Sequence, residues 1–115
     1  MDDGCRDEVA NQIRSRDVNE WIEEMVDRVG GGRRLDTYRC ECSDSRCRCG
    51  ISLSRREYED VRSDATHFAV AIHHEDPHLD HVLFEGERFA IVGLLPGRPS
   101  TRARDGDPRR RRPAA

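Results

Sequence analysis

Four cysteines lie within ten residues of one another, and this cluster constrains the chain more than any other feature of its sequence. The stretch from Cys40 to Cys49 reads C-E-C-S-D-S-R-C-R-C, so it holds two Cys-x-Cys pairs separated by four residues. Where thiols stay reduced, clustered cysteines are more often metal ligands or redox groups than structural disulfides. The cluster therefore predicts a bound metal, and zinc is favoured because thiolates are among its preferred ligands.

The composition leaves little apolar material for a core. Of the 115 residues, 35% are hydrophobic and 37% are charged. A chain of this length forms one domain at most, and a metal whose binding is coupled to folding stabilises a core this lean. Residues 96–115 include seven arginines and few apolar side chains. We therefore expect a single zinc-stabilised domain over residues 1–95 and a disordered arginine-rich tail over residues 96–115.

The sequence shows no segment that targets or anchors it to a membrane. Its first residues, up to Cys5, are acidic and precede no apolar run. No stretch approaches the roughly 18 apolar residues that a membrane span needs. We expect a cytoplasmic protein without a membrane partner, in which Cys5 is a free thiol.

Apolar residues recur at helical spacing over residues 6–29, and three glycines follow at 30–32. The glycines favour a helix end because glycine adopts the left-handed cap conformation at little cost. The simplest interpretation is a long helix whose apolar stripe covers a sheet; the alternative is a helix presented to a partner. The stripe consists of Val9, Ile13, Val18, Ile22, Met25 and Val29, with Trp21 and Val26 beside it.

The rest of the chain has the alternating pattern of short strands. Residues 35–42 and 49–53 flank a polar turn, which predicts a β-hairpin with cysteines at its tip. Ser54 and Glu57 form a capping box that starts a short helix ending near Asp64. Residues 67–72, 81–84 and 88–92 read as further strands. The predicted fold class is α+β: a small antiparallel sheet, a long N-terminal helix, a short second helix and a zinc-knuckle hairpin.

Several of these segments together resemble a family of small, uncharacterised bacterial proteins. The matching segments are Y-R-C-E-C at 38–42, Cys47, I-S-L-S at 51–54, E-Y-E-D-V-R at 57–62, F-A-V at 68–70 and H-E-D-P at 74–77. The family shares an F-x-C-E-C…C…I-x-L-T-x-x-E-Y-E-x-V-R…F-x-V-x-P-G-H-E-x-P core, and the resemblance covers about residues 8–93. It implies no activity, but it implies that Cys40, Cys42, Cys47 and His74 are recurrent positions. The chain departs from this core at 72–73, where Ile-His replaces Pro-Gly.

Two ligand sets therefore compete for the metal. Spacing along the chain favours Cys49 as the fourth ligand beside Cys40, Cys42 and Cys47, which gives a Cys₄ site. The resemblance favours His74, which gives a Cys₃His site, and imidazole is an ordinary zinc ligand. We prefer His74, because it follows a strand that can pair near the hairpin tip. Cys49 is then a core or bystander thiol, or a spare thiol for redox exchange.

All five histidines lie within residues 67–81. One interpretation is a second metal site, or a catalytic zinc with an open position; the simpler one is a solvated loop around His74. The spacing of His74 and His78 suits a helix, but Pro77 argues against one. A Cys₃His site fills all four tetrahedral positions, and the sequence has no glycine-rich phosphate loop or serine elbow. We therefore expect no enzymatic activity.

Three functions follow from these observations. The first is a non-catalytic zinc-binding module, acting as a regulatory or interaction protein with an unknown protein partner. The second is a thiol-based redox sensor that releases zinc on oxidation. The third is a nucleic-acid-associated protein. Seven arginines and two aspartates give the tail a charge of +5, and the net charge of −3 then leaves −8 for the remainder. The basic run consists of Arg109, Arg110, Arg111 and Arg112.

Overall fold

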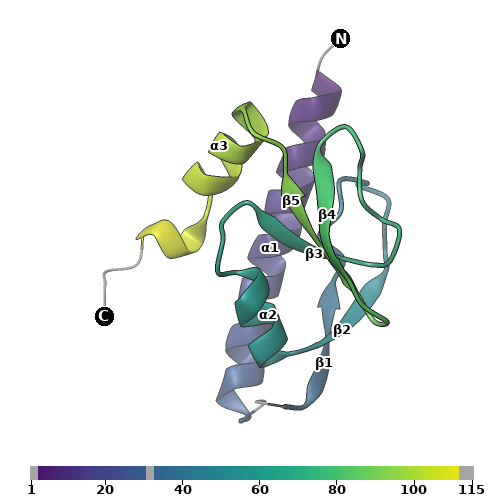
Figure 1. Ribbon diagram of the computed structural model, residues 1–115. Coiled ribbons are helices and arrows are strands. Elements are labelled where there is room, and N and C mark those ends of the chain that lie inside the picture. The colour runs from purple at the N-terminus through teal and green to yellow at the C-terminus, as the bar shows by residue number, and fades with distance from the viewer. Residues whose placement is uncertain (1–2, 31–32, 112–115) are drawn as a thin grey trace.

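The computed structural model describes residues 3–30 and 33–111, which form an α+β fold along one long helix (Figure 1). The elements in chain order are α1 (Asp3–Arg28), β1 (Leu35–Arg39), β2 (Gly50–Ser54), α2 (Arg55–Val61), β3 (His67–Val70), β4 (Asp80–Glu85), β5 (Ala90–Leu94), α3 (Arg98–Asp105) and a 3-10 turn, η1 (Pro108–Arg111). Helix α1 runs the length of the molecule, and the strands, α2 and α3 lie along it (Figure 1). The predicted fold class is confirmed.

The strands form two antiparallel sheets. β1 pairs with β2 in the predicted hairpin, with Tyr38 opposite Ile51, and the second sheet has the order β3-β5-β4. The predicted first strand reaches residue 42, but β1 ends at Arg39. Beyond it, the Glu41 N–H donates to the Ala69 carbonyl of β3 at 2.8 Å. The chain therefore leaves the first sheet and pairs with the second, which places the cysteine loop beside β3.

Helix α2 begins at the predicted capping box. Ser54 Oγ accepts from the Glu57 N–H at 3.1 Å, and the Glu57 carboxylate accepts from the Ser54 N–H at 2.8 Å. The buried Tyr58 of α2 stacks on Tyr38 of β1, with 4.7 Å between the ring centroids. This stacked pair fixes α2 against the hairpin.

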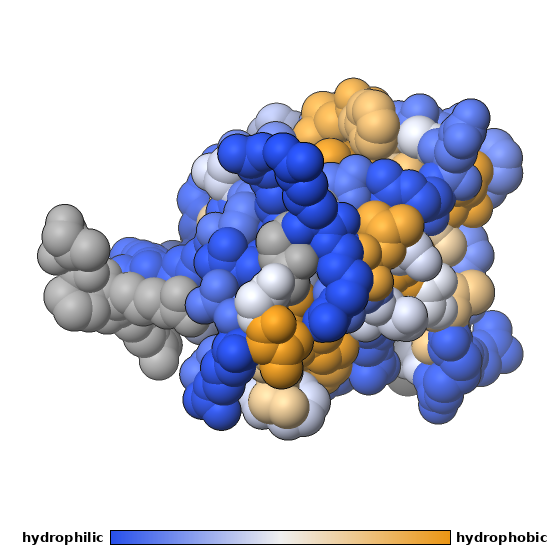
Figure 2. Space-filling model, turned by 90° about the horizontal axis from the view of Figure 1, so that it is seen from below, coloured by the Kyte–Doolittle hydropathy of each residue, from blue (hydrophilic) through white to orange (hydrophobic). Residues whose placement is uncertain are grey.

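Helix α1 turns a polar face towards the core and an apolar face towards solvent. Its buried polar side chains are Asn11, Gln12, Ser15, Arg16, Asn19, Glu20 and Glu23. Val18, Trp21, Met25 and Val29 are exposed, Trp21 by 61% and Val29 by 64%. The prediction that the apolar stripe covers a sheet is therefore wrong for these four residues. Val9 and Val26 are buried, and Ile13 and Ile22 are half-buried against the core. Figure 2, seen from the end of the molecule where α1 ends, shows apolar side chains at the surface in separate patches.

No helix in the described part of the chain, α1 included, is long and apolar enough to cross a membrane.

Residues 98–111 fold back onto α1, which corrects the expectation of a disordered tail after residue 95. Helix α3 buries Ser100 and Ala103, and the Ala103 carbonyl accepts from Arg16 Nη2 at 3.0 Å. Just beyond α3, the buried Asp107 accepts from Arg62 at the end of α2. Composition predicted disorder because the segment is nearly free of apolar residues, but polar contacts to α1 and α2 order it instead. Residues 112–115 lie outside the described part of the chain.

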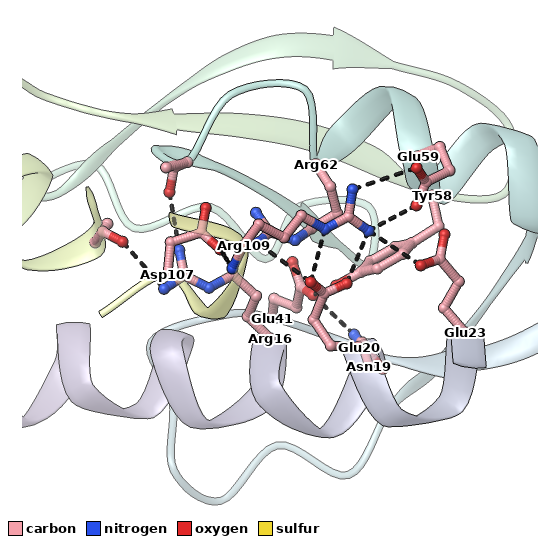
Figure 3. A network of polar contacts seen from close by, with 12 residues as sticks. Arg16, Asn19, Glu20, Glu23, Glu41, Tyr58, Glu59, Arg62, Asp107 and Arg109 are labelled. Atoms are coloured by element: carbon pink, nitrogen blue, oxygen red, sulfur yellow. Dashed lines mark hydrogen bonds and ion pairs between the residues drawn. The ribbon is translucent and has the colours of Figure 1, made fainter. Parts of the chain in front are cut away.

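Arg109 of η1 ties the C-terminal segment to both α1 and α2 (Figure 3). Its guanidinium donates to the two carboxylate oxygens of Glu20 at 2.7 and 2.8 Å. It also donates to Glu23 at 3.0 Å and to Glu59 at 2.6 Å. Bidentate arginine–carboxylate pairs of this kind are among the stronger polar contacts in proteins. The Arg109 side chain is therefore bound by carboxylates of the fold and does not extend into solvent as part of an exposed basic run. Arg112 lies outside the described residues.

The acidic cluster around Arg109 predicts a pH dependence of stability. Burial, together with the neighbouring Glu59 carboxylate, raises the pKa of Glu23 from its ordinary 4.5 to about 8. The folded state then binds more protons than the unfolded state between these two values, so this group lowers stability as the pH rises from about 5 to about 8. We expect Glu23→Gln to remove that loss, because the amide reproduces the protonated carboxyl.

The measurement is the free energy of unfolding of the wild type and the variant from pH 5 to pH 9. As the pH rises across this range, the free energy of unfolding of Glu23→Gln should increase relative to that of the wild type by on the order of 1 kcal/mol. Glu24→Gln is the matched control, since the Glu24 side chain is 62% exposed. A difference that stays constant with pH contradicts the prediction.

Candidate metal centre

Three cysteines and one histidine meet where the β1–β2 loop passes the end of β3. The three Sγ atoms and one imidazole nitrogen all lie within 4.8 Å of one another, and each residue offers one donor atom. Cys40 and Cys42 are buried, whereas the other two are half-buried. The group could hold a metal ion, and it consists of Cys40, Cys42, Cys47 and His74.

The imidazole of His74 faces the sulfurs through its Nδ1 atom. This nitrogen lies 3.6 Å from Cys40 Sγ and 3.6 Å from Cys47 Sγ. The structure thus brings His74 into the group and leaves Cys49 out of it. Cys49 is exposed and contributes its backbone instead: its carbonyl accepts from the Cys40 N–H at 3.1 Å.

A tight turn after β3 delivers His74 to the cysteines. The His74 N–H donates to the Ala71 carbonyl at 3.0 Å, which closes a four-residue turn. His73, in the third position of this turn, has a φ of 69°. A positive φ at that position is the mark of a type II turn, for which proline followed by glycine is the favoured central pair. Ile72 and His73 occupy these two positions here, so the turn keeps its shape without the residues that form it most readily.

The alternation of Cys40, Glu41 and Cys42 places the two candidate ligand sulfurs and the Glu41 carboxylate on opposite sides of the chain. Because successive residues of an extended chain point to opposite sides, the two sulfurs share one side and the Glu41 carboxylate takes the other. That carboxylate is fully buried and accepts three hydrogen bonds. The donors are Asn19 Nδ2 at 2.9 Å, the Tyr58 hydroxyl at 2.7 Å and the Ala69 N–H at 2.9 Å. Glu41 therefore links the cysteine segment to α1, α2 and β3 at once.

Two asparagines of α1 hold the backbone of the same segment. Asn19 accepts from the Arg39 N–H at 2.7 Å and donates to the Arg39 carbonyl at 2.7 Å, so its side chain imitates a neighbouring strand. About two helical turns before it, Asn11 donates to the Cys42 carbonyl at 3.0 Å. These contacts fix the positions of the two buried cysteines independently of any ion.

Backbone amides point at two of the sulfurs. The Ala71 N–H donates to Cys40 Sγ at 3.1 Å, and the Cys49 N–H donates to Cys47 Sγ at 3.5 Å. Such donors stabilise thiolates, which are the form in which cysteine binds metals. A hydrogen bond from Cys40 lowers the pKa of Cys42 to about 5, and the same bond raises the pKa of Cys40 itself. The thiols therefore do not lose their protons together, and a divalent ion must displace the protons that remain.

The other four histidines do not join this group. His67 lies on β3 and contacts Asp64 at 3.5 Å, while His73, His78 and His81 are exposed. Among the residues that the structure describes, they form no second cluster of metal-binding side chains. Cys5 carries no side-chain description in the structure, so the expectation of a free thiol there lies outside the described residues.

Sequence reasoning missed the residues that support the centre. Glu41 stands in the sequence as part of the Cys-Glu-Cys motif, and Asn11 and Asn19 lie within the predicted first helix without an assigned role. The signal for Glu41 was present in the Cys-Glu-Cys alternation, which places the middle residue opposite the two sulfurs. No comparable signal identifies the asparagines, because their partners lie 31 and 20 residues away.

We expect Glu41→Gln to destabilise the protein although the two side chains have the same shape. One carboxylate oxygen faces the Ala69 N–H, and the other faces Asn19 and Tyr58. In either orientation, the new NH₂ group meets a donor and leaves it unsatisfied, which costs about 1–3 kcal/mol. Urea unfolding at pH 7 measures this loss, and the exposed Glu24→Gln is again the control. Equal stability of Glu41→Gln and the wild type contradicts the role assigned to this carboxylate.

The chain was also compared with known proteins. No protein-family model, curated protein or solved structure matches it. The function of the site is therefore argued from its geometry, and the resemblance to the family of small bacterial proteins stays a prediction.

Proposed function

We propose that this chain is a small zinc-binding module, in which Cys40, Cys42, Cys47 and His74 hold one Zn²⁺ ion that stabilises the fold. The observation that carries the proposal is the spacing of the donor atoms. Zn–S bonds of about 2.3 Å and a Zn–N bond of about 2.05 Å, meeting at the tetrahedral angle of about 109°, place sulfur and nitrogen about 3.6 Å apart. Two of the three sulfur–nitrogen distances in the cluster, those from His74 Nδ1 to Cys40 and Cys47, are 3.6 Å.

The donor set favours zinc over other common ions. Calcium and magnesium prefer oxygen ligands, whereas three thiolates and one imidazole suit a borderline-soft ion with tetrahedral coordination. Four protein ligands fill a tetrahedron and leave no position for a water molecule or a substrate. The proposed role of the ion is therefore structural, and the module acts by binding a partner rather than by catalysis.

A structural role also agrees with how the core is built. The buried residues include many polar and charged side chains, among them Arg16, Glu41 and Arg62. Such a core gains less from the hydrophobic effect than an apolar one of the same size. An ion that joins residues 40–47 to residue 74 closes a long loop and adds the binding energy of the metal to the folding energy. The Ile72–His73 turn supports the family resemblance as well, because its geometry suits the Pro-Gly pair of the family core.

The test is a pair of substitutions in protein purified without added metal. We expect one zinc per chain in the wild type and in Cys49→Ser, because Cys49 is outside the donor group. His74→Ala should lower zinc affinity by at least about 100-fold and reduce the thermal stability of the fold, since it opens the tetrahedron. Zinc content is measured by mass spectrometry and affinity by competition with a chromogenic chelator.

Two results contradict the ligand set. Retention of zinc in His74→Ala with loss in Cys49→Ser replaces the Cys₃His site with a Cys₄ site. A wild-type protein that is folded and contains no metal removes the structural role altogether.

The position of Cys49 favours a second candidate function, release of zinc on oxidation. Its thiol is exposed, and its own N–H lies 3.5 Å from the sulfur of the ligand Cys47. Hydrogen peroxide can oxidise these two thiols to a disulfide: the thiols lose two electrons and two protons, and the peroxide is reduced to two water molecules. Cys47 then no longer binds the metal as a thiolate, and zinc leaves.

This candidate predicts a difference between the wild type and Cys49→Ser under peroxide. We expect the wild type to release zinc at least several-fold faster than the variant, and to recover it after treatment with a thiol reductant. Release is followed with a zinc-sensitive dye. Equal rates in the two proteins remove the redox function and leave the structural one.

A further inference from the structure

Helix α1 and the residue that follows it, Val29, carry an exposed apolar stripe. We define it by Val18, Trp21, Met25 and Val29, whose side chains are 38%, 61%, 46% and 64% exposed. Large apolar side chains that face solvent in a row usually mark a binding surface. We propose that the partner at this surface is a second copy of the same chain, with the two α1 helices packed antiparallel about a two-fold axis.

The spacing of the stripe suits helix pairing. Its members follow one another at intervals of three, four and four residues, so they form one row along the helix. Rows of this kind form the seam between two helices that cross at a small angle. The opposite side of α1 contacts the core mainly through polar side chains, so the apolar side is the one left for a partner.

The charges beside the stripe select an antiparallel copy. Asp17 and Arg28 are exposed and lie eleven residues, or about three turns, apart on the same flank, where Arg28 also contacts Glu24 of its own chain at 3.2 Å. In a parallel two-fold pair, this flank of one helix lies beside the opposite flank of the other, so Asp17 and Arg28 do not meet. In an antiparallel pair, Asp17 of one chain faces Arg28 of the other, twice over.

A single two-fold axis satisfies the apolar and the charged contacts together. The midpoints of three residue pairs fall on the same turn of α1, at residues 22–24. An axis through this turn therefore brings each residue of a pair opposite the other residue in the second chain. The pairs are Asp17 with Arg28, Trp21 with Met25, and Val18 with Val29. Indole and thioether groups make favourable contacts, so the central pair is well matched. The surface is therefore complementary to itself, which is the requirement for an isologous dimer.

The area is sufficient for a modest dimer. The four side chains together expose on the order of 400 Å², which corresponds to the apolar centre of an interface of about 600–800 Å² on each partner. Among the residues whose burial is described, a second group of exposed apolar side chains is Val82, Leu83 and Phe84 on β4, while Leu35 and Leu95 are exposed singly. β4 is an edge strand, but an irregularity between Val82 and Phe84 breaks its regular register and makes it a poorer template for pairing.

The experiment measures self-association of the full, zinc-loaded chain by sedimentation velocity from about 1 to 100 μM. We expect a concentration-dependent dimer that Trp21→Glu weakens at least about 100-fold. Leu83→Glu, a matched change on β4, should leave the dimer unchanged. Trp21 is the single tryptophan of the chain, so its emission maximum should shift to the red on dilution of the wild type. Far-UV circular dichroism confirms that each variant is folded.

Charge reversal tests the orientation. Asp17→Arg and Arg28→Asp should each weaken the dimer about 10-fold, and the double variant should restore it. Failure of the double variant to restore association overturns the antiparallel arrangement. A wild type that stays monomeric up to 100 μM, or a dimer that Leu83→Glu disrupts and Trp21→Glu does not, overturns the surface itself. Because every variant keeps the four metal-binding residues, these results are independent of the zinc assignment.

Discussion

The buried carboxylate of Glu41 is the point on which the arrangement of this protein depends. It stands between two cysteines of one extended segment, so the two buried sulfurs lie on one side of the segment and the carboxylate on the other. Its three donors come from α1, α2 and β3, and these are the elements that surround the cysteine loop. The Glu41 side chain therefore connects α1, α2 and β3 to the cysteine segment, and it determines on which side of that segment the sulfurs of the candidate metal site lie. A shift of this segment by one residue exchanges the two faces and removes both functions.

Polar interactions do much of what an apolar core does in other small domains. Arg16 is fully buried, donates to the carbonyls of Ala65 and Ala103, and lies over the ring of Phe68 with 5.4 Å between Cζ and the ring centroid. Arg109 binds three glutamates from two helices. Networks of this kind specify one arrangement sharply, because a missing partner leaves a buried polar group unsatisfied. They contribute less net stability than apolar burial, which is why the proposed zinc ion would matter for this chain.

The local features of the fold could be predicted from the sequence, and the long-range polar contacts could not. The capping box at Ser54, the cysteine hairpin and the long first helix each have a signal within a few residues. Helical periodicity also found the apolar row of α1, but it could not tell which side of the helix faces the core. The buried side is held by residues such as Asn19, whose hydrogen-bonding partners are distant in the sequence. The ordering of residues 98–111 was missed for the same reason, because Arg109 meets Glu20 and Glu59 only in the folded chain.

The candidate centre shows both what a local pattern can give and where it fails. Spacing alone predicted a metal and three of its cysteines but favoured Cys49 as the fourth ligand. His74, which the structure places beside the sulfurs, is 27 residues from Cys47 and reaches it only through the turn at His73.

Zinc K-edge X-ray absorption of the purified protein tests the central claim most directly. A shell of three sulfurs at about 2.3 Å and one nitrogen at about 2.0–2.1 Å is the result that the account predicts. A shell of four sulfurs, or one of oxygen and nitrogen without sulfur, contradicts it.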